Sequence, residues 1–289
     1  MSNINLIIEE RSRDIGNFSV GRLLPFRKKR MVGPFIFIDH MGPKSLKADE
    51  HLDVPPHPHI GLSTLTFLFE GEMMHRDSLG NKQLIKPGAV NWMTAGKGIV
   101  HSERTPDHLR NTATFLHGLQ ILVALPADKE KMEPSFTHVP AKDLPHWVEN
   151  DISFKLIAGH AFERTSPVPV HSNLFFVEIK SEKKKSLNIG KSLYGETALY
   201  ILAGKISSEG KTFGSKQILV AKDGSLCEFI IHPDTIIYSF GGERFESKRK
   251  IFWNFVATDQ ETIEKAKDDW QNGKFPKIAG ENEAVPLPK

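Results

Sequence analysis

In Pro55-Pro56-His57-Pro58-His59-Ile60-Gly61, two histidines alternate with prolines. A residue that precedes proline is kept out of the α region of backbone space, so Pro58 holds His57 extended. Residues two apart on an extended backbone point to the same side, which lets the imidazoles of His57 and His59 converge. The stretch therefore predicts a β-strand that presents two metal-ligating side chains on one face.

A second pair with the same spacing follows in Gly98-Ile99-Val100-His101-Ser102-Glu103. If the two segments lie side by side in a sheet, three imidazoles and one carboxylate meet at one point. Three nitrogens and one oxygen suit a first-row divalent metal ion, and an octahedral ion would keep two positions open for substrate or dioxygen. We therefore predict a catalytic rather than a structural metal site. Its predicted ligands are His57, His59, His101 and Glu103.

The first stretch also has an interpretation without a metal, because a lone His-Pro-His is often a turn with two surface histidines. Two such pairs favour the metal site, and seven of the 13 histidines lie between His51 and His117. Both pairs also lie beside glycine-rich and apolar runs rather than in a polar tract. Three histidines suit catalytic zinc as well, so the identity of the ion stays open at this point.

Composition limits the class of protein. With 289 residues the chain exceeds one average domain, and 25% charged with 39% hydrophobic residues is typical of a soluble protein. A formal net charge of +3 is too small to indicate direct nucleic-acid binding. The sequence lacks a signal-peptide pattern and an apolar run of the ~18 to 20 residues that cross a membrane, so we expect no membrane partner.

The cysteine content points to a reducing compartment. The single cysteine, Cys227, cannot form an intrachain disulfide, and a cytoplasmic location fits. Cys227 alternates with Phe229 and Ile231 in a predicted strand, so we expect a buried and inert thiol.

Short apolar runs separated by turns fill both halves of the chain and predict an all-β protein. The runs Phe67–Glu72 and Tyr200–Lys205 are weakly alike, each a strand that closes on a glycine, which suggests a duplicated β-barrel. The stretch from Ala127 to Pro145 has three prolines and little periodicity, as in a connection between domains. We therefore predict an N-terminal metal-binding domain of residues 1–135 and a C-terminal domain of residues 136–289.

The second domain is expected to be metal-free, because it has no paired histidines. The sequence near the C-terminus of this domain predicts one α-helix, in which Thr258 and Glu261 form a capping box and Gly273 follows the last turn. Ile263, Ala266 and Trp270 fall on one face of this helix, which we expect to pack on the sheets or against the other domain.

Three motifs together resemble those of the pirin family of the cupin superfamily. They are Gly33-Pro34-Phe35 with Asp39-His40, Pro56-His57-Pro58-His59, and Trp92-Met93-Thr94-Ala95-Gly96-Lys97-Gly98-Ile99-Val100-His101-Ser102-Glu103. The resemblance spans nearly the whole chain and implies a bicupin, with two cupin-type antiparallel β-barrel or sandwich domains and a C-terminal α-helix. Pirins bind iron in the N-terminal barrel through three histidines and one glutamate. The matching positions here are His57, His59, His101 and Glu103.

The resemblance also implies an activity, because several pirins are quercetin 2,3-dioxygenases, which cleave this flavonol with dioxygen. It implies Fe(II) as the cofactor, with zinc or another divalent transition metal as alternatives, and a flavonol-like aromatic substrate. Glu103 is the candidate catalytic residue, because its carboxylate offsets the charge of the ion and, once loosened, could accept the proton of a flavonol hydroxyl. The vertebrate pirin is described as a nuclear transcription coregulator, so the alternative is a non-catalytic iron-dependent redox sensor or regulator that binds a protein partner.

Two further expectations concern the surroundings of the site. Asp39 and His40 end a predicted buried strand, where they either bond to turn backbone or support the metal ligands from behind. Apolar side chains of the same barrel would form the substrate pocket, although the sequence does not say which of them face inward. The candidates are Phe35, Phe37, Leu65 and Trp92.

Overall fold

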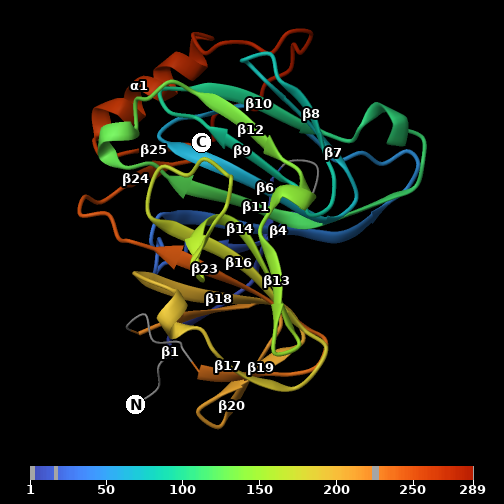
Figure 1. Ribbon diagram of the computed structural model, residues 1–289. Helices are drawn as coiled ribbons and strands as arrows, with labels where there is room; N and C mark the ends of the chain where they lie inside the picture. The colour runs from blue at the N-terminus through green and yellow to red at the C-terminus, as the bar shows by residue number, and fades with distance from the viewer. Residues whose placement is uncertain (1–3, 16–18, 223–227, 289) are drawn as a thin grey trace. The chain divides into compact units, whose positions relative to one another are not determined.

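A computed structural model describes residues 4–15, 19–222 and 228–288 of the chain. Within these residues strands dominate, and a single α-helix, α1 (Gln260–Gln271), lies near the C-terminus (Figure 1). The predicted all-β architecture with a C-terminal α-helix is confirmed. No helix in the described part is long and apolar enough to cross a membrane. The predicted burial of Cys227 concerns a residue outside the described ranges.

Two antiparallel sheets enclose the histidine-rich stretch (Figure 1). Counted over the described residues, the larger sheet has seven strands in the order β12-β9-β6-β11-β4-β3-β2, and the smaller has four in the order β5-β10-β7-β8. The larger sheet consists of β2 (Arg11–Asp14), β3 (Ser19–Leu24), β4 (Phe35–Leu46), β6 (Leu62–Glu70), β9 (Val90–Thr94), β11 (Thr114–Ala124) and β12 (Ser135–Val139). The smaller consists of β5 (Asp53–His59), β7 (Met73–Asp77), β8 (Lys82–Ile85) and β10 (Ile99–Arg104).

A second pair of antiparallel sheets is built from the C-terminal half of the chain together with the first strand of the chain. In the part that the structure describes, eight strands form one sheet and four form the other. The first contains β1 (Ile4–Glu9), β13 (His146–Glu149), β14 (Ile152–Ala161), β15 (Arg164–Thr165), β16 (Leu174–Ser181), β18 (Glu196–Ala203), β21 (Gln217–Ala221) and β23 (Thr235–Gly242). The second contains β17 (Lys185–Asn188), β19 (Lys205–Ser208), β20 (Lys211–Gly214) and β22 (Glu228–Ile231). This pair has its own apolar core, which includes Phe154, Val177, Leu199 and Phe229.

Short elements complete the chain. β24 (Lys250–Phe252) and β25 (Phe255–Ala257) form a two-stranded ribbon just before α1. Single turns of 3-10 helix occur at η1 (Asp107–Leu109), η2 (Ala127–Lys129), η3 (Ala141–Asp143) and η4 (Gly190–Ser192).

The contacts divide the chain into two compact units, each of which draws on three separate segments. One unit contains residues 1–11, 22–37 and 142–245, and the other contains residues 12–21, 38–141 and 246–289. This division differs from the predicted domains of residues 1–135 and 136–289. The predicted boundary falls at the start of β12, which pairs with β9. The first strand, β1, pairs with β21 of the C-terminal half, and α1 contacts β24 and β25 in the unit that contains the paired histidines.

Helix α1 begins one residue later than predicted. Its N-cap is Asp259, whose Oδ1 accepts a hydrogen bond of 2.7 Å from the Thr262 amide. Aspartate is a strong N-cap because its carboxylate satisfies a free amide of the first turn. The predicted capping box of Thr258 and Glu261 is therefore wrong. Thr258 instead donates from its amide and its hydroxyl to Glu130 Oε2, at 3.0 Å each.

The remaining predictions for this helix hold. Ile263 and Ala266 are buried in a cluster with Ile60 and Phe255, which fixes α1 to the unit that contains the paired histidines. The helix ends at its C-cap, Asn272, directly before Gly273. Gly273 has a φ of +65°, in the left-handed region that glycine adopts without strain.

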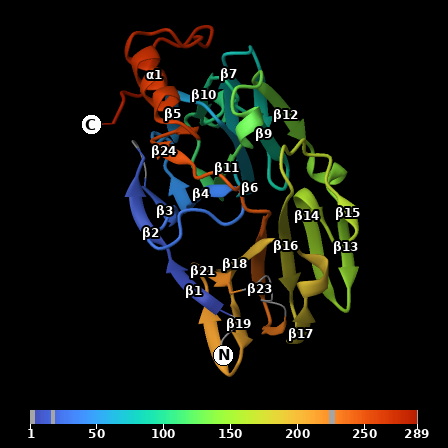
Figure 2. The same cartoon turned by 90° about the vertical axis from the view of Figure 1, so that its left-hand side faces the viewer.

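The chain after α1 returns along the strands that carry the histidines (Figure 2). The Val285 amide donates to the Pro56 carbonyl oxygen at 2.9 Å. The Glu281 carboxylate is 4% exposed and accepts hydrogen bonds from Ser102 Oγ and Arg104 Nη2, at 2.7 Å each. Ser102 lies between His101 and Glu103 in β10, so this tail holds the strand from the side opposite these two side chains.

Candidate metal centre

Strands β5 and β10 bring the two sequence pairs together. His57 lies directly opposite His101 in the ladder, and His59 lies two residues further along the same face. The register then shifts between His101 and Glu103, so that Glu103 pairs with Val54. The extra residues on β5 at this bulge are prolines, which have no N–H to donate to the ladder.

The three imidazoles converge at a buried point. Within the described residues, His57, His59 and His101 each offer one ligand atom, and these atoms all lie within 4.8 Å of one another. The Nε2 atoms of His59 and His101 are 3.0 Å apart. Two nitrogens that each lie about 2.1 Å from one ion, at a right angle, are separated by roughly 3 Å. The donor atoms therefore fit a single metal ion, although their role as ligands stays a prediction.

Burial keeps these imidazoles neutral. Desolvation lowers the pKa of His57 to about 4, and it lowers the pKa values of His59 and His101 well below 6.5. A neutral imidazole has one nitrogen with a free lone pair, which is the form that binds a metal ion. His57 Nδ1 lies 2.9 Å from the Pro55 carbonyl oxygen, to which it donates. This hydrogen bond leaves His57 Nε2 free for an ion.

Glu103 lies beside this cluster but outside its compact set of donor atoms. Its side chain is buried, and Oε1 accepts a hydrogen bond of 3.1 Å from Thr66 Oγ1 on the facing sheet. Burial raises the pKa of this carboxyl, partly offset by His75 and by the Thr66 hydroxyl. A nearby cation would favour the charged carboxylate. The structure thus brings three of the four predicted ligands together and places Glu103 at their margin.

Sequence reasoning missed two residues that support the cluster, His75 and Asp77 on β7. His75 Nδ1 lies 3.4 Å from His101 Nδ1, and His75 Nε2 lies 3.1 Å from Asp77 Oδ2. If His75 Nε2–H donates to Asp77, His75 Nδ1 accepts a hydrogen bond from His101 Nδ1–H, and His101 Nε2 presents a free lone pair to the cluster. Asp77 is itself held by the amides of Leu79 and Asn81. The spacing of His75 and Asp77 is that of the two pairs already used, so the same argument could have found them.

Replacing Asp77 with asparagine tests this support. We expect Asp77→Asn to weaken metal binding by roughly 10- to 100-fold, as is typical when the outer partner of a metal-bound histidine is lost. The reason is that the neutral amide no longer fixes the tautomers of His75 and His101. Competition with a chromophoric chelator measures the affinity, and circular dichroism checks the fold.

The matched control is Asp107→Asn, which removes a carboxylate whose side chain is 78% exposed and which lies 4.0 Å from Arg76. This variant should bind metal as the wild type does. An affinity of Asp77→Asn within twofold of the wild type would show that Asp77 has no such role.

The apolar residues predicted to line a pocket lie elsewhere. Leu65 pairs with Trp92 on the face of the large sheet opposite Thr66, away from the cluster. Phe35 packs edge-on against Phe240 at 5.3 Å, among residues of the other unit. For Leu65 the sequence could not show this orientation, because β6 is buried on both faces and its pattern does not distinguish them.

Asp39 and His40 were predicted to end a buried strand, but β4 continues to Leu46, so both lie within the strand, and both are buried. His40 Nε2 lies 2.8 Å from His117 Nε2, so two imidazoles from β4 and β11 pair with each other. The sequence had suggested turn backbone or a metal ligand as the partner of His40, and it did not suggest this pairing with a second imidazole.

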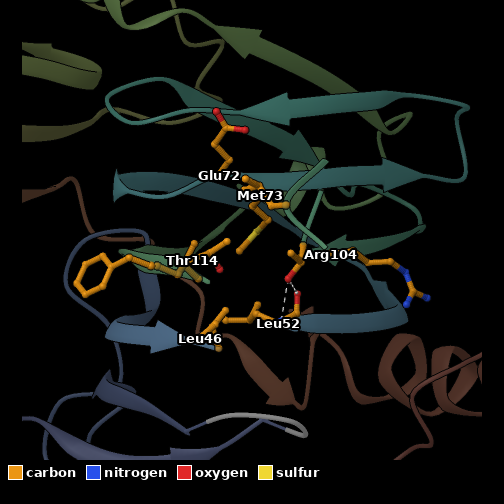
Figure 3. A pocket seen from close by; sticks show the side chains of 10 residues that line it. Leu46, Leu52, Glu72, Met73, Arg104 and Thr114 are labelled. Carbon is orange, nitrogen blue, oxygen red and sulfur yellow. Dashed lines mark hydrogen bonds between the residues drawn. The ribbon is translucent and has the colours of Figure 1, made fainter. Parts of the chain in front are cut away.

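A separate small pocket lies in the same unit, lined by Leu46, Leu52, Met73, Arg104 and neighbouring residues (Figure 3). Its volume is about 10 Å³, which is enough for about one water molecule. At its edge, the Leu52 amide donates a hydrogen bond to Thr105 Oγ1, and Thr105 Oγ1 donates to the Leu52 carbonyl oxygen, so these polar groups have partners within the protein. This pocket is too small for an aromatic substrate and contains none of the histidine cluster.

Comparison with known proteins gives consistent matches over the whole chain. The family model for pirin matches residues 17–123, and the model for the pirin C-terminal cupin domain matches residues 176–276. A pirin-like protein of Caulobacter vibrioides is 45% identical over 99% of this chain and 100% of its own length.

Solved structures agree. The crystal structure of a quercetin 2,3-dioxygenase from Acinetobacter baumannii is 37% identical, with a TM-score of 0.90 over 98% of this chain and 95% of that chain. A bacterial pirin from Escherichia coli, in complex with nickel(II), is 17% identical with a TM-score of 0.65 over 83% of this chain and 99% of its own, a level that supports the fold alone. The predicted pair of cupin-type domains is confirmed.

Proposed function

Because the chain belongs to the pirin family, we propose that it is a metal-dependent dioxygenase that cleaves quercetin or a related flavonol with dioxygen. The buried cluster of three neutral imidazoles carries this proposal. The similarity to the Acinetobacter baumannii quercetin 2,3-dioxygenase supports the choice of substrate class. The proposed ligands are His57, His59, His101 and Glu103, and the proposed ion is Fe(II), with zinc or another divalent transition metal as the alternatives.

The chain's own residues would bind and orient the ion. The three histidines present lone pairs from β5 and β10, and the pair of His75 and Asp77 fixes the ring of His101. A bound Fe(II) would supply the open positions and the redox chemistry that dioxygen requires. The four proposed ligand residues are buried, and the low local dielectric strengthens the electrostatic interactions among them.

Glu103 would act as the proton acceptor. Its carboxyl is buried, and a bound cation would favour the carboxylate, which is the form that accepts a proton. The proton would pass from a flavonol hydroxyl to a carboxylate oxygen of Glu103. Thr66 Oγ1, which donates to Oε1, holds the carboxylate in place during this transfer.

Anaerobic loading with Fe(II), followed by quercetin and dioxygen, tests the proposal. We expect loss of the quercetin absorbance together with release of carbon monoxide. Normal iron content without turnover would refute the enzyme hypothesis and favour the alternative that the protein is a redox sensor or a regulator that binds a protein partner. Elemental analysis of protein from an unsupplemented host decides between iron, zinc and other metals.

A further inference from the structure

A row of polar side chains crosses the larger sheet on one face. It runs over four adjacent strands, in the order His138 on β12, Asn91 on β9, Thr66 on β6 and Gln120 on β11. Each residue lies directly opposite the next in its ladder. Directly opposed residues of antiparallel strands project from the same face of a sheet. The four side chains therefore form one continuous polar row.

This row faces the histidine cluster. Thr66, in the middle of the row, donates to Glu103 at 3.1 Å. Phe136 lies two residues before His138 on the same face of β12, and its ring stacks on His75 with a centroid distance of 4.4 Å. One contact thus connects this face with a proposed ligand on β10, and the other connects it with His75, which supports His101 from β7.

Two groups on either side of Thr66 are buried without a hydrogen-bond partner. The Asn91 side chain is 3% exposed, and its Oδ1 lies 2.7 Å from His138 Nδ1. This contact fixes the orientation of the amide and leaves the donor Nδ2 unsatisfied. On the other side, the acceptor Gln120 Oε1 is also buried and unsatisfied. An unsatisfied buried polar atom lowers stability, so a ligand that satisfies both atoms would gain affinity from them.

Apolar side chains lie beside the polar row. Met93 and Leu122 lie directly opposite Thr64 on its two sides, one row along the same face. Both are buried. They provide an apolar surface against which a flat ring can pack.

We propose that Asn91 and Gln120 are specificity-determining residues that bind the oxygen atoms of the substrate. The ligand class is a planar hydroxylated aromatic, with an acceptor oxygen at Asn91 Nδ2 and a hydroxyl donor at Gln120 Oε1. The inference rests on the proposed function, because it assumes that the substrate lies against the face of the larger sheet that carries Thr66 and faces Glu103.

Gln120→Met is the first test, because it keeps the length of the side chain and removes the acceptor. Binding is measured by fluorescence titration of the metal-loaded protein without dioxygen, using quercetin and the unhydroxylated parent flavone. We expect quercetin to bind roughly tenfold more weakly to this variant, the typical effect of one lost hydrogen bond. Flavone, which has no hydroxyl to donate, should bind as it does to the wild type.

Asn91→Asp is the second test, because it keeps an acceptor for His138 and removes the donor. The carbonyl oxygen common to both ligands loses its partner, so quercetin and flavone should both bind roughly tenfold more weakly. The metal content of both variants is measured to confirm that the cluster is intact. Gln217→Met, which makes the same exchange on β21 of the other unit, is the matched control and should change neither affinity.

Stability separates recognition from a structural role. Gln120→Met removes a buried oxygen that has no partner, so its thermal unfolding midpoint should equal or exceed that of the wild type. A lower midpoint together with weakened binding of both ligands would identify Gln120 as structural and overturn its part of the proposal.

The outcomes also separate this inference from the proposed function. Turnover by the wild type, with unchanged quercetin affinity in both variants, would refute the recognition row and leave the dioxygenase standing. Quercetin binding that depends on both residues, without turnover, would support the row and refute the dioxygenase. Failure of quercetin to bind the wild type would overturn the ligand class proposed here.

Discussion

His101→Ala is expected to abolish stoichiometric metal binding and to leave the protein folded. His101 lies at the centre of the cluster, with its Nε2 3.0 Å from His59 Nε2 and its ring 4.3 Å from that of His57. Its loss leaves two imidazoles. We therefore expect the affinity for the metal ion to fall by more than about 100-fold, a larger effect than the loss of a residue that only hydrogen-bonds to a ligand. The fold should persist because the apolar cores of both units are formed by other residues. Elemental analysis after gel filtration measures the bound metal.

His108→Ala is the matched control for this experiment. His108 belongs to the same unit, and its imidazole is 57% exposed beside Glu72. This variant should retain a full complement of metal and the unfolding midpoint of the wild type. Unchanged metal content in His101→Ala would remove His101 from the ligand set, and loss of metal in both variants would indicate a general effect on the barrel.

The convergence of the histidines was predictable because its cause is local. An extended chain repeats every two residues, so His57 with His59 needs only an extended backbone, which Pro58 favours. The pairing of His57 with His101 was a hypothesis about the sheet, and the ladder has this register. The bulge at the prolines was not predicted, and it accompanies the shift that pairs Glu103 with Val54.

The surroundings of the site were not predictable in the same way. Almost every residue of β6 is buried, so its sequence does not show that Thr66 rather than Leu65 faces the ligands. A shift of one residue exchanges the two faces of a strand, and only the tertiary structure decides between them. The sequence did not single out Asn91 and Gln120 as binding residues. A polar side chain in an apolar strand points to a site only when it is known which face of the sheet the side chain lies on.

The division into units had no local signal at all. Strand β1 at the N-terminus pairs with β21, more than half the chain away. A boundary drawn from composition assumes that each domain is one continuous segment. The structure breaks that assumption at both ends of the chain. The N-terminal strand β1 pairs with β21, and Thr258, just before the terminal helix, donates hydrogen bonds to Glu130 in the first half of the chain.

Glu130→Ala is expected to destabilise the unit that contains the histidine cluster strongly, because Glu130 forms a buried ion pair with Arg249. The two side chains are 4% and 1% exposed, and Arg249 Nε lies 3.1 Å from Glu130 Oε1. Without the carboxylate, a guanidinium charge stays buried and the two donors of Thr258 lose their acceptor. Breaking one partner of a buried pair costs about 3–5 kcal/mol in free energy of unfolding. Urea denaturation followed by tryptophan fluorescence measures the change.

The exposed ion pair of Lys97 and Glu133 provides the matched comparison, with side chains 55% and 78% exposed. Glu133→Ala should change the free energy of unfolding by less than about 1 kcal/mol, because solvent screens such a pair. Replacing both buried partners, as Glu130→Leu with Arg249→Met, should recover much of the loss, since no unpaired charge then remains. Equal effects of Glu130→Ala and Glu133→Ala would show that the buried pair does not anchor the C-terminal segment to the barrel that carries the histidines.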